Sequence, residues 1–170
     1  TTYSPQVQRA IDFLLSVQDP NSGHFGYTEA YSHAIATYSL AECYALTEDP
    51  KLRPALEKAV AHILERQNKS DDPRKRGGWS YYYPDDRVYD SWPRASITTW
   101  QVMALESARL GGLTVPEEAF QLAHQFLLTS HGAGCYTSQA AMKRYNRTNQ
   151  RLADAAERAS VVATWLGAAA

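Results

Sequence analysis

The sequence repeats one pattern three times, and this repeat restricts the fold more than any other feature. In each unit an amphipathic helix is followed by a loop with glycine and an aromatic residue, and then by a helix that is apolar on nearly all faces. The three loops contain Gly23-His24-Phe25, Gly78-Trp79 and Gly134-Cys135-Tyr136. Tandem helical hairpins with a period of roughly 50 to 65 residues pack as a two-layer arc, with the apolar helices inside. An ordinary six-helix bundle is the alternative.

Hydrophobic periodicity and capping signals predict six helices, and no segment alternates with a period of two for long enough to predict a sheet. The fold class expected is therefore all-α. A proline after Ser4 and another after Asp49 mark two of the helix starts. The second, fourth and sixth helices should be more buried than the first, third and fifth. The expected spans are 5–18, 33–46, 50–67, 95–110, 116–129 and 152–166.

Composition excludes several classes of protein. The chain has 170 residues, which suits one domain over 1–170 or a part of a larger one. A balance of 17 basic against 18 acidic residues argues against nucleic-acid binding, and no apolar run is long enough to span a membrane. The two cysteines, Cys43 and Cys135, cannot form a disulfide framework and favour a reducing compartment such as the cytoplasm. Eleven tyrosines and four tryptophans suggest a cavity lined by aromatic rings.

Two of the repeat loops carry a recognisable motif. Gln18-x4-Gly23-x-Phe25 and Gln67-x10-Gly78-Trp79 resemble loosened forms of the Q-x3-G-x-W repeat of squalene–hopene cyclases. In such a repeat we expect Trp79 to pack against the end of the third helix, near Gln67. The segment 97–105 is similar to inner helices of those cyclases and of protein prenyltransferase β subunits. The segments 31–46, 77–79 and 95–116 resemble bacterial proteins with the prenyltransferase and squalene oxidase repeat.

The resemblance covers about residues 5–140 and implies an α/α toroid, which five or six hairpins close around a central cavity. This chain supplies three hairpins, so we expect half of a toroid or a fragment of one. The final predicted helix then has an apolar flank around Trp165 with nothing to cover it. We expect the chain either to self-associate as a homo-oligomer or to depend on a second half of the toroid.

Catalytic signatures of the related enzymes are not found in the sequence. Class II terpene cyclases protonate an alkene with a D-x-D-D acid, whose clustered carboxylates keep one carboxyl protonated. The nearest runs here, Asp71-Asp72 and Asp85-Asp86, lie in polar loops and are interpreted as solvated turn residues. A cyclase could still carry its acid outside this chain.

The zinc ligands of protein prenyltransferases are also replaced. Their D-x-C-Y-S-x-W-Q motif, aligned on Trp100-Gln101, puts Arg94 at the aspartate and Ser96 at the cysteine. A guanidinium cannot bind zinc and serine is a poor ligand, so a zinc prenyltransferase is not expected. The sequence predicts no metal and no other cofactor.

Five residues are candidates for ligand binding. His33 lies at the expected mouth of an inner helix, where the resemblance to prenyltransferases implies a contact with diphosphate, and where free N–H groups attract anions. The alternative is a capping or core histidine bonded to a carbonyl. Arg94, at the matching place in the next unit, forms either part of an anion-binding rim or a surface ion pair. The full set is His33, Tyr38, Arg94, Ser96 and Trp100.

Two functions follow from these observations. The first is a non-catalytic repeat domain that binds an apolar, isoprenoid-like ligand, a peptide or a partner. The second is a portion of an isoprenoid cyclase with its D-x-D-D acid elsewhere, in which aromatic faces stabilise carbocations. A polysaccharide-active α/α enzyme is a third class, and it would need a pair of inward carboxylates. Only Glu42 and Glu106 lie on predicted inner helices.

Overall fold

The structure, a computed structural model, describes residues 4–26, 29–83 and 92–132. These residues contain five α-helices. Between these helices the described residues form loops and two isolated β-bridges, with no named strand. The prediction of an all-α fold is confirmed, and the sixth predicted helix, 152–166, lies outside the described residues. The helices are α1 (Ser4–Val17), α2 (Ala30–Thr47), α3 (Arg53–Glu65), α4 (Ala95–Leu110) and α5 (Glu117–Gly132).

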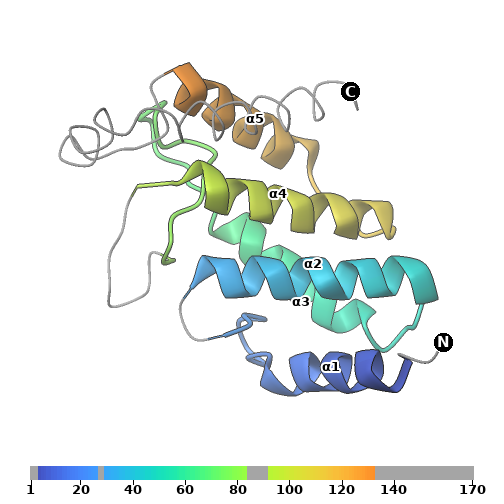
Figure 1. Cartoon of the computed structure of the whole chain (residues 1–170). Helices are drawn as coiled ribbons and strands as arrows, with labels where there is room; N and C mark the ends of the chain where they lie inside the picture. Colours follow the sequence, from blue (N-terminus) through green and yellow to red (C-terminus); the bar gives the residue numbers. More distant parts are fainter. Residues whose placement is uncertain (1–3, 27–28, 84–91, 133–170) are drawn as a thin grey trace, which may run out of the picture.

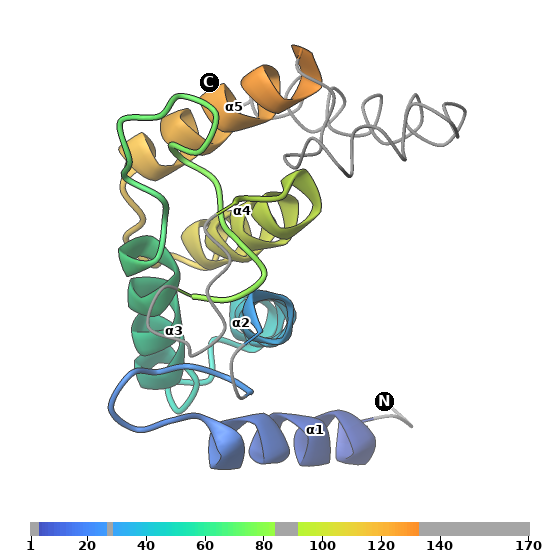
Figure 2. The same cartoon turned by 90° about the vertical axis from the view of Figure 1, so that its left-hand side faces the viewer.

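The helices form two layers. Helices α2 and α4 lie side by side and run in the same direction, with α3 packed behind them (Figures 1 and 2). Helix α1 lies beyond α2 at one end of the arrangement, and α5 lies beyond α4 at the other. We therefore call α2 and α4 the inner helices and α1, α3 and α5 the outer helices. Each outer helix that is followed by a described inner helix pairs with it as a hairpin.

The boundaries of α4 agree with the prediction, whereas α3 begins later than expected. Asp49 forms a separate turn ahead of α3, because its carboxylate accepts the Lys51 N–H at 3.0 Å and its carbonyl accepts the Leu52 N–H. Helix α3 then starts at Arg53, with Pro54 in its first turn, where the missing N–H costs nothing. Helix α2 begins at Ala30, three residues before the predicted start.

The expected order of burial holds for α4 but not for α2. Ten of the 16 residues of α4 are buried and none of the described side chains of α1 is. Eight of 18 residues are buried in α2, against six of 13 in α3, so the inner helix α2 is not more buried than α3. The reason is that the loop between α1 and α2 covers α3, while one side of α2 faces away from every described helix.

Two glutamines join the successive units. The Gln18 side-chain amide donates to the Gly23 carbonyl in its own loop and to the Ala55 carbonyl of α3, both at 2.9 Å. The Gln67 amide does the same one unit later, to Gly77 at 3.0 Å and to Ala119 of α5 at 2.9 Å. Each glutamine therefore links its loop to the next outer helix by hydrogen bonds, rather than only capping its own helix.

A glycine lies beside each glutamine because the loop backbone passes close to the next helix. Gly23 has φ +74°, and a Cβ there would come within 2.6 Å of Lys58 Cβ. Gly77 has φ +88°, and its Cβ would lie 2.1 Å from the Leu122 carbonyl oxygen. Gly77 is therefore the counterpart of Gly23, rather than Gly78, which the motif comparison selected. Gly78 is needed for a different reason, since it packs against Pro93 and Phe126.

The aromatic residue of each loop enters the core. Phe25 and Trp79 are both 1% exposed. As predicted, Trp79 packs against the end of α3, where its indole N–H donates to the Ile63 carbonyl at 2.9 Å. The loop that carries Trp79 thus links α3 to the start of α4.

Candidate functional site

Four of the five candidate residues lie on or beside one face of the inner helices. Four side chains of α2, at positions 31, 35, 38 and 42, recur at intervals that place them on one side of the helix. The corresponding side chains of α4, at positions 96, 100, 103 and 107, also lie on one side. Because α2 and α4 run in parallel, the two stripes lie next to each other. We call them the α2–α4 face: Tyr31, Ile35, Tyr38 and Glu42 of α2, and Ser96, Trp100, Met103 and Ser107 of α4.

Contacts across the two helices hold the α2–α4 face together. The Tyr31 hydroxyl donates to Ser96 Oγ at 2.7 Å near the helix starts. In the middle, the rings of Tyr38 and Trp100 meet edge to face with centroids 6.1 Å apart. Apolar atoms remain accessible there, since Ile35 is 41% exposed and Met103 37%. The face is therefore an aromatic and aliphatic surface in its central part and polar at both ends.

Arg94 lies at the end of this face where both inner helices begin. Its guanidinium stands 5.5 Å from the centroid of the Tyr81 ring and also donates to the Trp92 carbonyl at 2.7 Å. The Tyr81 ring in turn lies 5.8 Å from that of Tyr31. The positive charge is thus placed among aromatic rings beside the positive ends of two parallel helix dipoles. Neither Tyr31 nor Tyr81 was among the residues selected from the sequence.

The two carboxylates on the inner helices do not form a pair. Glu42 accepts a short hydrogen bond from the Ser107 hydroxyl across the α2–α4 face. Glu106 accepts two hydrogen bonds from the neighbouring Arg109 guanidinium, from Nε and Nη2, at 2.9 Å each. Since each carboxylate has its own partner, the arrangement does not provide the facing acid and base that polysaccharide hydrolysis requires.

His33 lies away from the α2–α4 face, in a buried cluster of three histidines. The ring centroids of His24, His33 and His62 lie 4.9 to 5.0 Å from one another, and the Tyr83 ring packs against them. His33 is completely buried, and the other two are 7% and 6% exposed. Sequence reasoning did not find His24 or His62. The available signal was that His24 lies within the glycine–aromatic motif and that His62 interrupts the apolar stripe of α3.

Hydrogen bonds fix the neutral form of His33. Its Nδ1 accepts the backbone N–H of Phe25 at 3.0 Å, so the proton resides on Nε2, which lies 3.1 Å from the Ala59 carbonyl. Burial, together with the neighbouring imidazoles, lowers the pKa of His33 to about 3. Burial likewise lowers the pKa of His62 to about 4. His33 has the contacts of a core histidine bonded to a carbonyl, which was one of the two interpretations of this residue.

The part of the chain that the structure describes offers no metal centre. Both ring nitrogens of His33 are already bonded to the backbone, so it has no lone pair to give. Over residues 4–26, 29–83 and 92–132, no three His, Cys, Asp or Glu side chains are arranged to hold a metal ion. Ser96, which replaces a zinc-ligating cysteine in the prenyltransferase comparison, is instead bonded to Tyr31.

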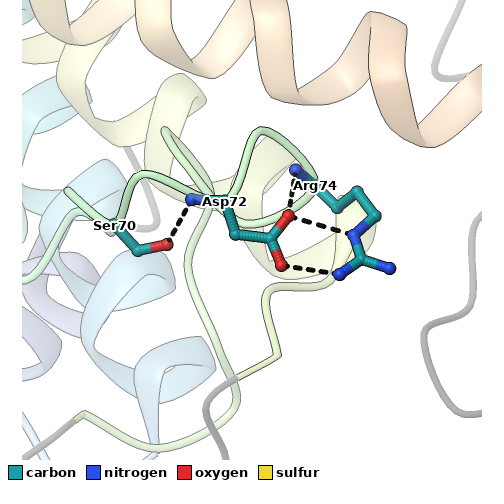
Figure 3. A network of polar contacts seen from close by, with 3 residues as sticks. All are labelled: Ser70, Asp72 and Arg74. Atoms are coloured by element: carbon teal, nitrogen blue, oxygen red, sulfur yellow. Dashed lines mark hydrogen bonds and ion pairs between the residues drawn. The ribbon is translucent and has the colours of Figure 1, made fainter.

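The acidic loop is built as a solvated turn. Asp72 accepts the Arg74 backbone N–H and two bonds from the Arg74 guanidinium, while its own N–H donates to Ser70 (Figure 3). These bonds with Arg74 lower the pKa of Asp72 to about 2. A cyclase acid has to remain protonated, and the surroundings of Asp72 favour the opposite state. Asp85 and Asp86 lie outside the described residues.

The fold and the α2–α4 face together define a class: tandem helical hairpins of a partial α/α toroid, whose inner helices present aromatic side chains. Comparison with protein families makes this specific. The family model of the squalene-hopene cyclase C-terminal domain matches residues 1–143, so the chain belongs to that family. Neither the comparison with curated proteins nor the comparison with solved structures gives a significant match. In the described part of the chain, no helix is both long and apolar enough to cross a membrane.

Proposed function

We propose that this chain is a non-catalytic repeat domain, a single unit over residues 1–170, that binds an apolar, isoprenoid-like ligand along the α2–α4 face. The observation that supports this most is the accessible apolar centre of that face, formed by Ile35, Tyr38, Trp100 and Met103. Flat aromatic rings and flexible aliphatic side chains suit a branched hydrocarbon, because contact area and dispersion supply the binding energy without directional bonds.

The polar ends of the face suit the ends of such a ligand. Arg94 and the Tyr31–Ser96 pair stand at one end, and Glu42 with Ser107 stands at the other. A ligand with an anionic or hydrogen-bonding head would place that head near Arg94 and extend its chain toward Met103. A peptide with an apolar segment is the other ligand that the same surface would accommodate.

The acids of the described residues support the non-catalytic assignment. The carboxylate of Asp72 is held ionised by Arg74, while Glu42 and Glu106 are each bound by a separate partner. Membership of the squalene-hopene cyclase family supports one alternative, in which this chain is a portion of an isoprenoid cyclase whose acid lies outside residues 1–170. In that case the aromatic rings of the face would stabilise cationic intermediates.

Calorimetric titration with farnesol, an uncharged isoprenoid alcohol, tests the binding proposal. Trp100→Ala and Tyr38→Ala should each raise the Kd by roughly tenfold, since losing one aromatic contact removes about 1–2 kcal/mol. Phe13→Ala is the matched control, because this exposed ring lies on α1, away from the face. An equal loss of affinity in all three variants would contradict the proposal. So would saturable binding whose Kd is unchanged by Trp100→Ala and Tyr38→Ala.

Incubation with squalene, followed by chromatography of the extracted hydrocarbons, tests the assignment as non-catalytic. We expect squalene to be recovered unchanged. A cyclised product from the purified chain would show that a sufficient acid is present, and Asp72→Asn would then reveal whether it is the acidic loop.

A further inference from the structure

Glu42 places a carboxylate on the α2–α4 face, beside its apolar centre. Tyr38 lies one turn earlier on the same side of α2, about 6 Å away along the helix axis. The Ser107 hydroxyl donates to Glu42 from α4, so the carboxylate lies between the two inner helices. The negative charge is therefore close to the rings of Tyr38 and Trp100, whose centroids are 6.1 Å apart.

No basic side chain within residues 4–26, 29–83 and 92–132 forms an ion pair with Glu42. Helix α2 contains no lysine or arginine, and α4 contains Arg109 alone. The Arg109 guanidinium is bound by Glu106 and stands 5.1 Å from the centroid of the Phe120 ring of α5. The ion pairs of the described residues use other carboxylates, those of Glu57, Asp71, Asp72, Glu106 and Glu117.

The ends of the two inner helices add to this negative charge. Because α2 and α4 run in the same direction, their C-terminal ends, each with a partial negative charge, lie at the same end of the face (Figure 1). Basic side chains normally stabilise such an end, and the last turn of α2 has none. This end of the face therefore attracts positive charge.

The fold needs an acceptor at position 42 but not a charge. Ser107 is 4% exposed, so its hydroxyl needs a partner, and the amide oxygen of a glutamine would serve as well as a carboxylate. A negative charge near two helix C-termini is unfavourable for the helices themselves. The carboxylate is thus better explained by what binds at the face than by the stability of the fold.

We propose that the ligand of the α2–α4 face carries a positively charged amine, which Glu42 binds. This inference rests on the proposed function and names the class of ligand, an apolar, isoprenoid-like chain with a primary ammonium group. The ammonium donates to the Glu42 carboxylate in a charge-assisted hydrogen bond, and the nearby rings of Tyr38 and Trp100 attract the same cation. The apolar chain extends over these rings toward Tyr31. In the opposite orientation the ammonium would meet the positive charge of Arg94.

Calorimetric titration with farnesylamine and farnesol compares two ligands that share one chain and differ only in the head group. The amine is protonated at neutral pH, and we expect its Kd to be roughly tenfold or more below that of farnesol. Added salt should reduce this difference, because Glu42 is exposed and the ion pair is screened. Binding of farnesol tests the proposed function, whereas the ratio of the two Kd values tests this inference.

Two matched substitutions locate the charge that is responsible. Glu42→Gln keeps an acceptor for Ser107 and should bring the two Kd values to within about twofold of each other. Glu48→Gln is the control, because it removes an exposed carboxylate at the C-cap of α2, beyond the end of the face. This variant should retain the preference for the amine.

The outcomes separate the inference from the proposed function. If farnesol binds and farnesylamine binds no more tightly, the inference is wrong and the proposed function stands. If neither ligand binds, both are wrong. A preference for the amine that survives Glu42→Gln would overturn the inference. So would a preference that Glu42→Gln and Glu48→Gln reduce equally, since the amine would then respond to the net charge of the chain rather than to one site.

Discussion

His33 and Thr98 perform the same task in successive repeats with different chemistry. Each is the fourth residue of its inner helix and completely buried. His33 Nδ1 accepts the backbone N–H of Phe25 at 3.0 Å, and Thr98 Oγ1 accepts that of Trp79 at 3.1 Å. A buried N–H needs an acceptor, and either an imidazole nitrogen or a hydroxyl oxygen supplies one. The repeat therefore preserves the hydrogen bond rather than the residue.

Removing the hydroxyl of Thr98 should destabilise the protein. Thr98→Val keeps the shape of the side chain but leaves the Trp79 N–H buried without an acceptor, which should lower the free energy of unfolding by about 1–3 kcal/mol. Urea denaturation measures the change. Thr99→Val is the control, because that hydroxyl bonds only to the Ala95 carbonyl of its own helix. If both variants unfold alike, the Trp79–Thr98 bond has no special role.

Trp79 should tolerate phenylalanine far better than alanine. Trp79→Ala removes a large ring that is 1% exposed, and the free energy of unfolding should fall by about 3–5 kcal/mol. Trp79→Phe keeps much of the packing and loses the bond to the Ile63 carbonyl, so about 1–2 kcal/mol is expected. Tyr81→Ala, at a site 40% exposed, should cost less than either. Thermal and urea denaturation would contradict this ranking if Trp79→Ala behaved like the parent.

Gln67 should be more sensitive to glutamate than to alanine. Its amide group donates to two carbonyl oxygens, Gly77 and Ala119, in a site that is 6% exposed. Gln67→Glu replaces both donors with a carboxylate that faces two acceptors, whereas alanine only removes the bonds. We expect Gln67→Ala to lose about 2 kcal/mol of stability and Gln67→Glu to lose more. The reverse order in urea denaturation would show that the glutamine does not act as a double donor.

The histidine cluster should make the fold sensitive to acid. The folded-state pKa values of His33, about 3, and His62, about 4, lie below the ordinary value of 6.5. The unfolded chain therefore binds more protons than the folded chain, and stability should fall as the pH drops from 6.5 toward 4. Each histidine contributes up to about 1.4 kcal/mol per pH unit in this window.

One substitution separates the cluster from general acid effects. His62→Phe should reduce the loss of stability between pH 6.5 and 4, because it removes one of the two histidines whose pKa is lowered, while His33 keeps its own contribution. His124→Gln, outside the cluster, is the control and should leave the slope as it is in the parent chain. Urea denaturation at several pH values provides the comparison, and equal slopes in all three proteins would refute the assignment.

Metal ions should not contribute to stability. Because both nitrogens of His33 are bonded to the backbone, the three histidines cannot bind zinc without breaking the core. We expect elemental analysis of protein purified without chelators to show no stoichiometric zinc, and added zinc to leave the melting temperature unchanged. Stoichiometric zinc would show that the ligands lie elsewhere in the chain.

Local chemistry was enough to predict the helices and the class of fold. Apolar periodicity, prolines in first turns and the glycine pair after α4 are local signals, and the structure follows them closely at α1, α4 and α5. The burial of Trp79 was also predictable, since the large apolar ring of a repeated glycine–aromatic loop is expected to pack against the adjoining helices. The late start of α3 was missed because the bond from the Lys51 N–H to the Asp49 carboxylate, which here closes a turn, is the same kind of bond that caps a helix.

Contacts between distant segments were decided only in the tertiary structure. Gln18 and Ala55 meet because two units stack, and no local pattern in the sequence states which carbonyl a side-chain amide will reach. The sequence drew attention to His33 but not to His24 and His62. Only the packing of α2, α3 and the loop between α1 and α2 brings the three rings together. The choice of Gly77 over Gly78 depends on how closely the loop approaches α5. Periodicity along a helix specifies which side is apolar, but the partner of that side is set by the packing of whole units against one another.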